Sequence, residues 1–137
     1  MTTPDRWVRF ESAQGPRQGY IEGETIVPIA GDMFGDWRPE ADPVPLTGAR
    51  LLAPVIPPTF YACGINYAGH WRTAAEEFGL DLDKSWPKYP EVGYRAQSAI
   101  IGPGDPIILP ADVPPNVQVE GELAVVIGRR AKHVRPE

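Results

Sequence analysis

Proline and glycine interrupt this chain so often that most of it cannot be helical. Its 137 residues include 17 prolines and 14 glycines, which break the sequence into short stretches. Proline removes a helix hydrogen bond, and glycine costs backbone entropy inside any regular element. Hydrophobic residues still make up 42% of the chain, with four Trp, five Tyr and four Phe, which is enough to form a core. We therefore interpret the excess of proline and glycine as turns in a β-rich fold.

Charge and cysteine content exclude several classes of protein. The formal net charge is −5 and no basic face stands out, so we expect no nucleic-acid partner. The single cysteine, Cys63, excludes an internal disulfide, suits a reducing cytoplasm and is expected in the core. No apolar run approaches the roughly 20 residues that cross a bilayer, and the first residues lack the apolar core of a signal peptide. The sequence thus predicts a cytoplasmic protein with no membrane partner.

The chain divides by pattern near residue 51. Residues 7–10 alternate apolar and polar side chains, and residues 19–21 and 25–27 flank a glycine-containing hairpin connection. Residues 35–48 carry several prolines and acids and are interpreted as a surface linker. We expect a small N-terminal β-rich region over residues 1–50 and a second domain over residues 51–137. Strands of the second domain are predicted at residues 60–63, 93–95, 99–101, 107–109 and 117–127.

Only residues 67–78 have the periodicity of an amphipathic helix. Asn66 stands where it could cap the start of this helix, and Gly79 stands where it could end it. Apolar side chains recur along one face at helical spacing: Tyr67, Trp71, Ala74, Ala75 and Phe78.

Two glutamates in the last predicted strand suggest a metal site. Glu120 and Glu122 are two residues apart, so in a strand they project from one face about 7 Å apart. The strand over residues 117–127 is apolar on both faces and is therefore expected to be buried on both. Two buried carboxylates need a compensating cation, and oxygen ligands suit Mg²⁺, Mn²⁺ or Ca²⁺ better than zinc. The alternative is an exposed strand end whose acids meet solvent or an arginine.

His70 and Arg95 are candidates for catalysis. His70 lies in the predicted helix, but Thr73 and Ala74 give it no orienting carboxylate one turn on, and Glu77 is two turns away. His70 is therefore either a general base or a structural histidine. Arg95 has apolar neighbours, where a permanent planar cation suits a substrate carboxylate. Its alternative role is a salt bridge to one of the two glutamates.

Three motifs in this order resemble the fumarylacetoacetate hydrolase superfamily. They are Gly64-Ile65-Asn66-Tyr67-Ala68-Gly69-His70, the segment from Tyr94 to Ile107, and Glu120-Gly121-Glu122-Leu123-Ala124-Val125-Val126-Ile127-Gly128. The resemblance extends from about Leu51 to the end, and residues 1–50 resemble the small N-terminal region of many members. It implies a mainly β (α+β) fold, a mixed β-sandwich roll that is incomplete in this chain.

The resemblance also implies a site and a chemistry. By position, Glu120 and Glu122 would bind Mg²⁺ or Mn²⁺ and His70 would act as the base. A third carboxylate, an Asp on a later strand, is not in this chain, so we expect a second chain or segment carrying the C-terminal half. Family substrates are mostly 2-oxo or β-diketo acids, which undergo C–C hydrolysis, decarboxylation or isomerisation through a metal-stabilised enolate. Members are commonly homodimers.

Two positions depart from the family pattern. Thr73 stands where many members have a Glu that partners the histidine, and Arg95 stands where many have a Lys. Arginine binds and polarises but does not readily give up a proton. Glu76 and Glu77 are candidate substitutes for the missing partner only if the helix is broken or the loop after it folds back.

Three hypotheses about function follow. The first is a divalent-metal-dependent enzyme of the family that acts on a small oxo-acid, with Glu120 and Glu122 for the metal, His70 for base chemistry and Arg95 for the substrate. The second is an altered member that binds an oxo-acid-like ligand without the usual hydrolysis, which the threonine at position 73 favours. The third is a truncated fragment with no activity of its own.

Overall fold

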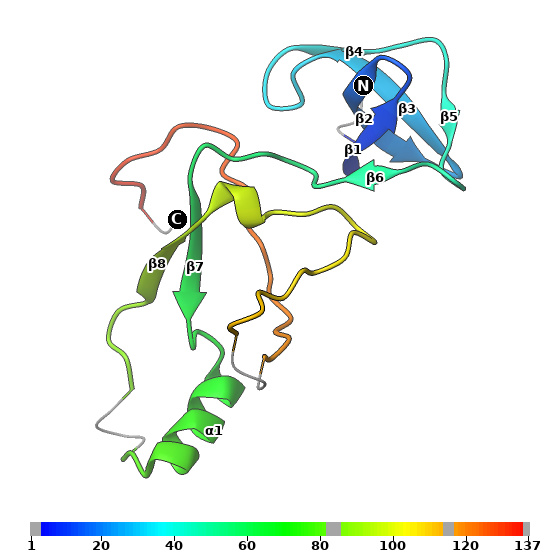
Figure 1. Cartoon of the computed structure of the whole chain (residues 1–137). Coiled ribbons are helices and arrows are strands. Elements are labelled where there is room, and N and C mark those ends of the chain that lie inside the picture. The colour runs from blue at the N-terminus through cyan, green and yellow to red at the C-terminus, as the bar shows by residue number, and fades with distance from the viewer. Residues whose placement is uncertain (1–3, 82–85, 114–116, 136–137) are drawn as a thin grey trace. The chain divides into compact units, whose positions relative to one another are not determined.

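The computed structural model describes residues 4–81, 86–113 and 117–135 (Figure 1). The described chain is mostly β with one α-helix, as the sequence predicts. It divides into two compact units, residues 1–54 with 102–137 and residues 55–101. The expected domain boundary between residues 50 and 51 stays a prediction. In the described ranges, no helix is long and apolar enough to cross a membrane.

The first unit contains an antiparallel sheet. Its strands follow the order β4-β3-β2-β1-β6, and β5 also pairs with β3. The predicted hairpin is confirmed, because β2 and β3 pair up to Glu22 and Thr25 across a two-residue turn. The bounds are β1 Trp7–Ser12, β2 Gly15–Glu22, β3 Thr25–Gly31, β4 Trp37–Pro39, β5 Val44–Pro45 and β6 Leu51–Leu52.

The interpretation of residues 35–48 as a linker is wrong in part. Both β4 and β5 lie within this segment and pair with β3. Proline is tolerated in such short outer strands, because the backbone N–H that it lacks is not needed there to bond a neighbouring strand. The ring of Trp37 also packs edge-on against Trp7 and Tyr20, with centroids 5.1 Å and 5.8 Å away. The tertiary contacts of the tryptophan thus outweigh the local turn signals.

The core of the first unit follows from the alternation of apolar residues in the strands. Val8, Phe10 and Ile26 are buried together, and Ile21, Val44 and Leu51 pack around them. Gly19 lies opposite Val8, where an added Cβ would come within 2.7 Å of the Val27 carbonyl oxygen. Glycine is therefore required there by close packing of the backbone.

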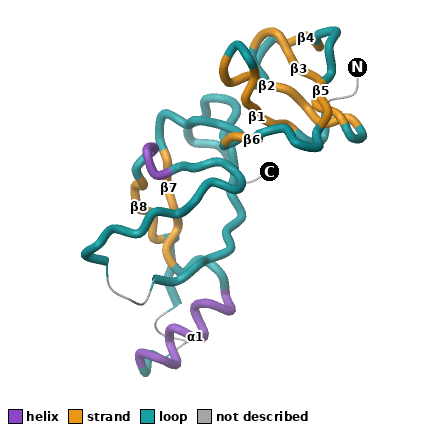
Figure 2. Tube along the Cα trace, turned by 45° about the vertical axis from the view of Figure 1, so that its right-hand side comes forward, coloured by secondary structure: helices purple, strands orange, loops and turns teal. Residues whose placement is uncertain are grey.

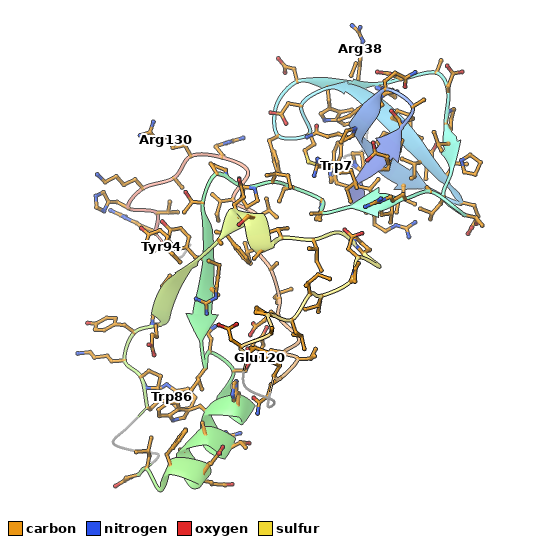
Figure 3. All side chains as sticks on the ribbon, viewed as in Figure 1. Trp7, Arg38, Trp86, Tyr94, Glu120 and Arg130 are labelled. Carbon is orange, nitrogen blue, oxygen red and sulfur yellow. The ribbon has the colours of Figure 1, made fainter. Side chains whose placement is uncertain are left out.

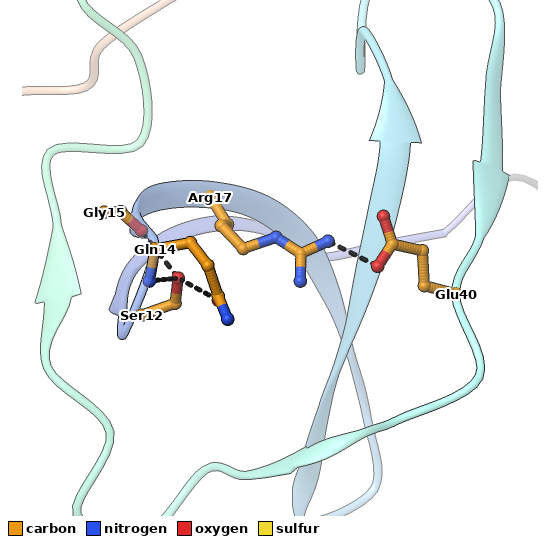
Figure 4. Close-up of polar contacts among 5 residues, drawn as sticks. All are labelled: Ser12, Gln14, Gly15, Arg17 and Glu40. Carbon is orange, nitrogen blue, oxygen red and sulfur yellow. Dashed lines mark hydrogen bonds and ion pairs between the residues drawn. The ribbon is translucent and has the colours of Figure 1, made fainter.

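Polar side chains fix the β1–β2 turn and tie β2 to the residue after β4 (Figure 4). The Ser12 hydroxyl donates to the Gly15 carbonyl oxygen at 2.7 Å and accepts from the Gln14 backbone N–H at 3.2 Å. Arg17 Nη2 lies 2.6 Å from Glu40 Oε2. Both groups are partly exposed, so we assign this ion pair at most about 1 kcal/mol of stability.

Two strands predicted in the last third of the chain do not form. Residues 107–109 and the described residues 117–127 contain no strand, and their apolar side chains are largely exposed, including Val119 at 92% and Leu123 at 81%. A strand exists only where its backbone N–H and C=O groups find a partner. The described residues provide no strand that pairs with these segments. The expected burial of the 117–127 strand on both faces is therefore wrong in this chain.

The second unit pairs β7 (Phe60–Gly64) with β8 (Glu91–Arg95) and carries α1 (Ala68–Phe78) after β7 (Figure 2). The helix prediction is confirmed, and Gly79 ends α1 with a left-handed backbone, φ 64°. The predicted cap is wrong, because Tyr67 is the N-cap residue and makes no side-chain capping bond. The predicted strand at 99–101 is wrong too: a 3-10 helix occupies Gln97–Ala99.

Candidate active site

The connection from β7 to α1 positions His70. Ile65 follows β7 with φ +40°, a conformation that costs a β-branched residue roughly 1–3 kcal/mol. This turn directs the chain from the strand into α1, whose third residue is His70. The side chain is exposed and has no hydrogen-bond partner among the described residues. His70 is therefore not a buried structural histidine.

Thr73 is engaged with the helix backbone. Its hydroxyl donates to the Gly69 carbonyl oxygen at 3.3 Å, one turn back. The hydroxyl proton is thus in use, and Thr73 can only accept a hydrogen bond from another group. Glu76 and Glu77 are exposed on the same helix. Neither forms a hydrogen bond or ion pair with His70 in the described part of the chain, and α1 is unbroken from Ala68 to Phe78, so no break in the helix brings either of them to His70.

Arg95 ends β8, where it lies opposite Phe60. Its Nη1 donates to the carbonyl oxygen of Tyr94 at 3.1 Å, and the guanidinium folds back over Gly93, where an added Cβ would lie 3.0 Å from Nη1. The side chain is exposed, and no ion pair to it occurs in the residues that the structure describes. Most of its five N–H donors therefore remain available to a carboxylate. The alternative salt bridge to Glu120 or Glu122 would join the two units and stays a prediction.

Glu120 and Glu122 lie on an irregular segment of the first unit. Figure 3 labels Glu120 on this segment. Both are exposed and neither has a hydrogen bond or ion pair within the described chain. Their carboxylate oxygens are suitable ligands for a hard divalent cation. The described residues contain no group of three or more His, Cys, Asp or Glu side chains that could hold a metal ion. Because residues 117–127 do not form a strand here, the expected placement of the two carboxylates on one face is not seen, and their role as metal ligands stays a prediction.

A tyrosine pair on the two strands was not predicted from the sequence. Tyr61 and Tyr94 face each other across β7 and β8, with ring centroids 4.9 Å apart and planes inclined by 42°. A side-chain hydrogen bond with Tyr94 and the charge of that neighbour raise the pKa of Tyr61 above its ordinary value. The two residues sit in predicted strands, but only the pairing register brings them together.

Cys63 is exposed near the end of β7, so its expected place in the core is wrong. Alternation explains the difference. Phe60 and Ala62 are half-buried on this strand, and Tyr61 and Cys63 point to the other side.

These β7, α1 and β8 elements, followed by a Glu-Gly-Glu segment, define a known class of protein. A family model described as fumarylacetoacetate (FAA) hydrolase, C-terminal, matches residues 59–137. A second, described as Rv2993c-like, N-terminal, matches residues 5–54. The chain belongs to the fumarylacetoacetate hydrolase family, and the resemblance drawn from the three motifs is confirmed.

Individual relatives agree with this assignment. The chain is 38% identical to Protein Rv2993c of Mycobacterium tuberculosis over 92% of its own length and 47% of that protein. It is 34% identical to the mitochondrial oxaloacetate tautomerase Fahd2a of Rattus norvegicus, covering 82% of this chain and 33% of the relative. The crystal structure of 5-carboxymethyl-2-hydroxymuconate delta-isomerase from Mycobacterium smegmatis superposes with a TM-score of 0.61 at 33% identity, covering 78% and 39% of the two chains.

Two facts follow from these relatives. The chain spans less than half the length of each of them. Two of the three are named as enzymes that isomerise a substrate, so the family to which this chain belongs includes enzymes of that type.

Proposed function

We propose that this chain forms the first part of a family enzyme that isomerises a small 2-oxo acid by moving a proton next to the carbonyl group. The observation that carries the proposal is the state of His70, an exposed imidazole in the first turn of α1 with no carboxylate partner in the described chain. The names of the relatives, a tautomerase and a delta-isomerase, support the choice of reaction.

His70 is assigned the proton transfer. Activation of water for C–C hydrolysis benefits from a carboxylate that orients the histidine, but the hydroxyl of Thr73 is bonded to Gly69 instead. The C–H proton next to the carbonyl group of a 2-oxo acid is acidified by that carbonyl. An imidazole without a carboxylate partner is therefore a sufficient base to remove it. This difference favours isomerisation over hydrolysis and decarboxylation, which are the other reactions considered for this site.

Glu120 and Glu122 would hold Mg²⁺ or Mn²⁺, together with a third carboxylate from outside residues 1–137. A divalent cation bound there supplies positive charge that stabilises negative charge developing on a substrate oxygen. Arg95 would bind the substrate carboxylate through its free N–H donors and orient the proton that is removed. The complete domain, built with this third ligand, is expected to act as a homodimer.

Proton exchange tests the proposal directly. The complete domain containing this chain is incubated with a 2-oxo acid and Mn²⁺ in D₂O, and loss of the proton next to the carbonyl is followed by NMR. We expect exchange without C–C cleavage, and His70→Gln should slow it by about 10²–10⁴-fold. Cleavage at a rate equal to exchange would refute isomerisation as the reaction.

The metal ligands are tested separately by titration with Mn²⁺. Glu120→Gln or Glu122→Gln should abolish stoichiometric binding. The double variant Glu76→Gln/Glu77→Gln, which removes two exposed acids of α1, should leave binding unchanged. An equal loss of Mn²⁺ binding in the single variants and in the Glu76→Gln/Glu77→Gln variant would mean that the cation is held by general negative charge and not by this site.

The threonine at position 73 also favours a second candidate function, a member of the family that binds an oxo-acid without turnover. The same experiment distinguishes the two. Saturable binding of the oxo-acid with no proton exchange would support the binding protein.

A further inference from the structure

The turn at residues 102–105 lies directly against the N-terminal sheet. A Cβ added to Gly102 would come within 3.1 Å of the carbonyl oxygen of Leu51, the first residue of β6. The carboxylate of Asp105 closes the turn, because one oxygen accepts from the Gly102 N–H at 2.9 Å. Its other oxygen lies 3.3 Å from Arg50 Nη2. Backbone packing and one ion pair therefore attach this turn to the sheet.

A second contact with the sheet lies further along the chain, at Gly128. A Cβ added to Gly128 would come within 2.9 Å of the Phe34 ring, so glycine lets the ring lie close to the backbone. Phe34 belongs to the connection between β3 and β4, where its N–H donates to Asp32 Oδ1 at 3.1 Å. The N–H of Gly35 donates to the Asp32 carbonyl oxygen at 2.9 Å. The connection that carries Phe34 is thus held in place by its own hydrogen bonds.

These two contacts lie on either side of the segment that carries Glu120 and Glu122. The sheet, the contacts and the segment all belong to the first unit. The described residues between the contacts, 106–113 and 117–127, form no strand, so the contacts at the ends restrict their backbone. A segment held at both ends samples fewer conformations than one held at a single end. It therefore loses less entropy when its side chains bind a common ligand.

We propose that the N-terminal sheet positions the segment of Glu120 and Glu122 through two residues, Arg50 and Phe34. Both act on the ends of the segment and not on a ligand, so they are positioning residues. What the two glutamates bind rests on the proposed function, whereas the order of the segment can be measured without any metal. The N-terminal region would then contribute to the site without supplying a ligand.

The order of the segment is measured by ¹⁵N relaxation of the Gly121 and Glu122 backbone amides, in the full chain without metal. Arg50→Gln removes the ion pair, and Phe34→Ala removes the ring. We expect the order parameters to fall from about 0.85 toward about 0.6 in the double variant and by less in each single variant. Arg50→Lys keeps the charge and should keep the order.

Arg17→Gln is the matched control. It breaks the ion pair of the same unit that joins Arg17 to Glu40, neither of which belongs to the segment. If Arg50 only stabilised the unit, Arg17→Gln would loosen the segment as much as Arg50→Gln does. We expect no change of order in Arg17→Gln. The amide signals of β1 to β3 report that each variant is folded.

The consequence for the site is measured by titrating Mn²⁺ into the complete domain containing this chain. The double variant should bind about tenfold more weakly than the unaltered domain, and Arg17→Gln should bind equally well. If the unaltered domain bound no Mn²⁺, the proposed metal role of the glutamates would fail, and the order parameters would still decide the positioning. Unchanged order in the double variant, an equal loss of order in Arg17→Gln, or lost order with unchanged Mn²⁺ affinity would each overturn the inference.

Discussion

Replacing Gly79 by alanine should weaken the helix that carries His70. Gly79 ends α1 in the left-handed conformation, φ 64° and ψ 32°, and its N–H donates to the Glu76 carbonyl oxygen at 3.3 Å. The next residue, Leu80, donates to the Ala75 carbonyl oxygen at 2.8 Å, which completes the helix end. A Cβ added at Gly79 would meet nothing within 4 Å. The substitution therefore changes conformational energy alone, with no clash.

The size of the effect follows from that geometry. A residue other than glycine costs about 1–2 kcal/mol in the left-handed region. Alanine also restricts the unfolded chain, which returns roughly 0.4–1 kcal/mol. The net cost is about 1 kcal/mol, which corresponds to about a fivefold change in the opening equilibrium of the helix.

Gly69→Ala is the matched control with the opposite sign. Gly69 is the second residue of α1, and a Cβ there also meets nothing within 4 Å. Because its backbone is helical, alanine should stabilise α1 by about 0.5–1 kcal/mol. Both variants add the same methyl group to the same helix, so the difference isolates the backbone conformation.

Native-state amide exchange at Ala74 and Ala75, the buried residues of α1, measures both effects. Exchange there should be about fivefold faster in Gly79→Ala and about two- to fivefold slower in Gly69→Ala. A change in the same direction in both variants would refute the reasoning, because it would mean that the two glycines do not differ in backbone conformation.

Three further predictions concern other parts of the chain. Phe10→Ala, at a side chain 1% exposed, should cost about 3–5 kcal/mol, close to the whole stability of so small a unit, and should abolish its cooperative urea unfolding by near-UV circular dichroism. Gly31→Ala should lower the thermal midpoint more than Gly15→Ala, since both have φ near +100° but only at Gly31 does the new Cβ overlap a backbone carbonyl oxygen; equal losses would contradict the steric argument. Tyr94→Phe should lower the pKa of Tyr61 toward its ordinary value by removing the bond that raises it, measured by phenolate absorbance. In the unaltered chain, the stabilisation from this pair should be complete below the ordinary tyrosine pKa and lost as pH rises through the raised one.

The sequence determined the features that depend on near neighbours in the chain. Alternation placed Val8 and Phe10 on the buried side of β1, and the spacing of apolar residues with a following glycine located α1. The order of the three motifs identified the family, because a motif is recognised from its residue types and their order alone, without knowledge of where the residues lie in space. These signals act over a few residues, where backbone geometry alone relates position to direction.

Only the tertiary structure decided which strands form and which side chains meet. Residues 37–39 became a strand because β3 offers an edge, whereas residues 117–127, with a stronger strand pattern, have no pairing strand in the described chain. The Tyr61–Tyr94 pair depends on the register between β7 and β8, and the edge-to-face contact of Trp71 with Trp86 depends on how the segment before β8 packs against α1. Hydrogen bonds between strands and contacts between distant side chains join residues whose separation no local pattern encodes. A propensity for strand therefore becomes a strand only when the fold supplies the partner.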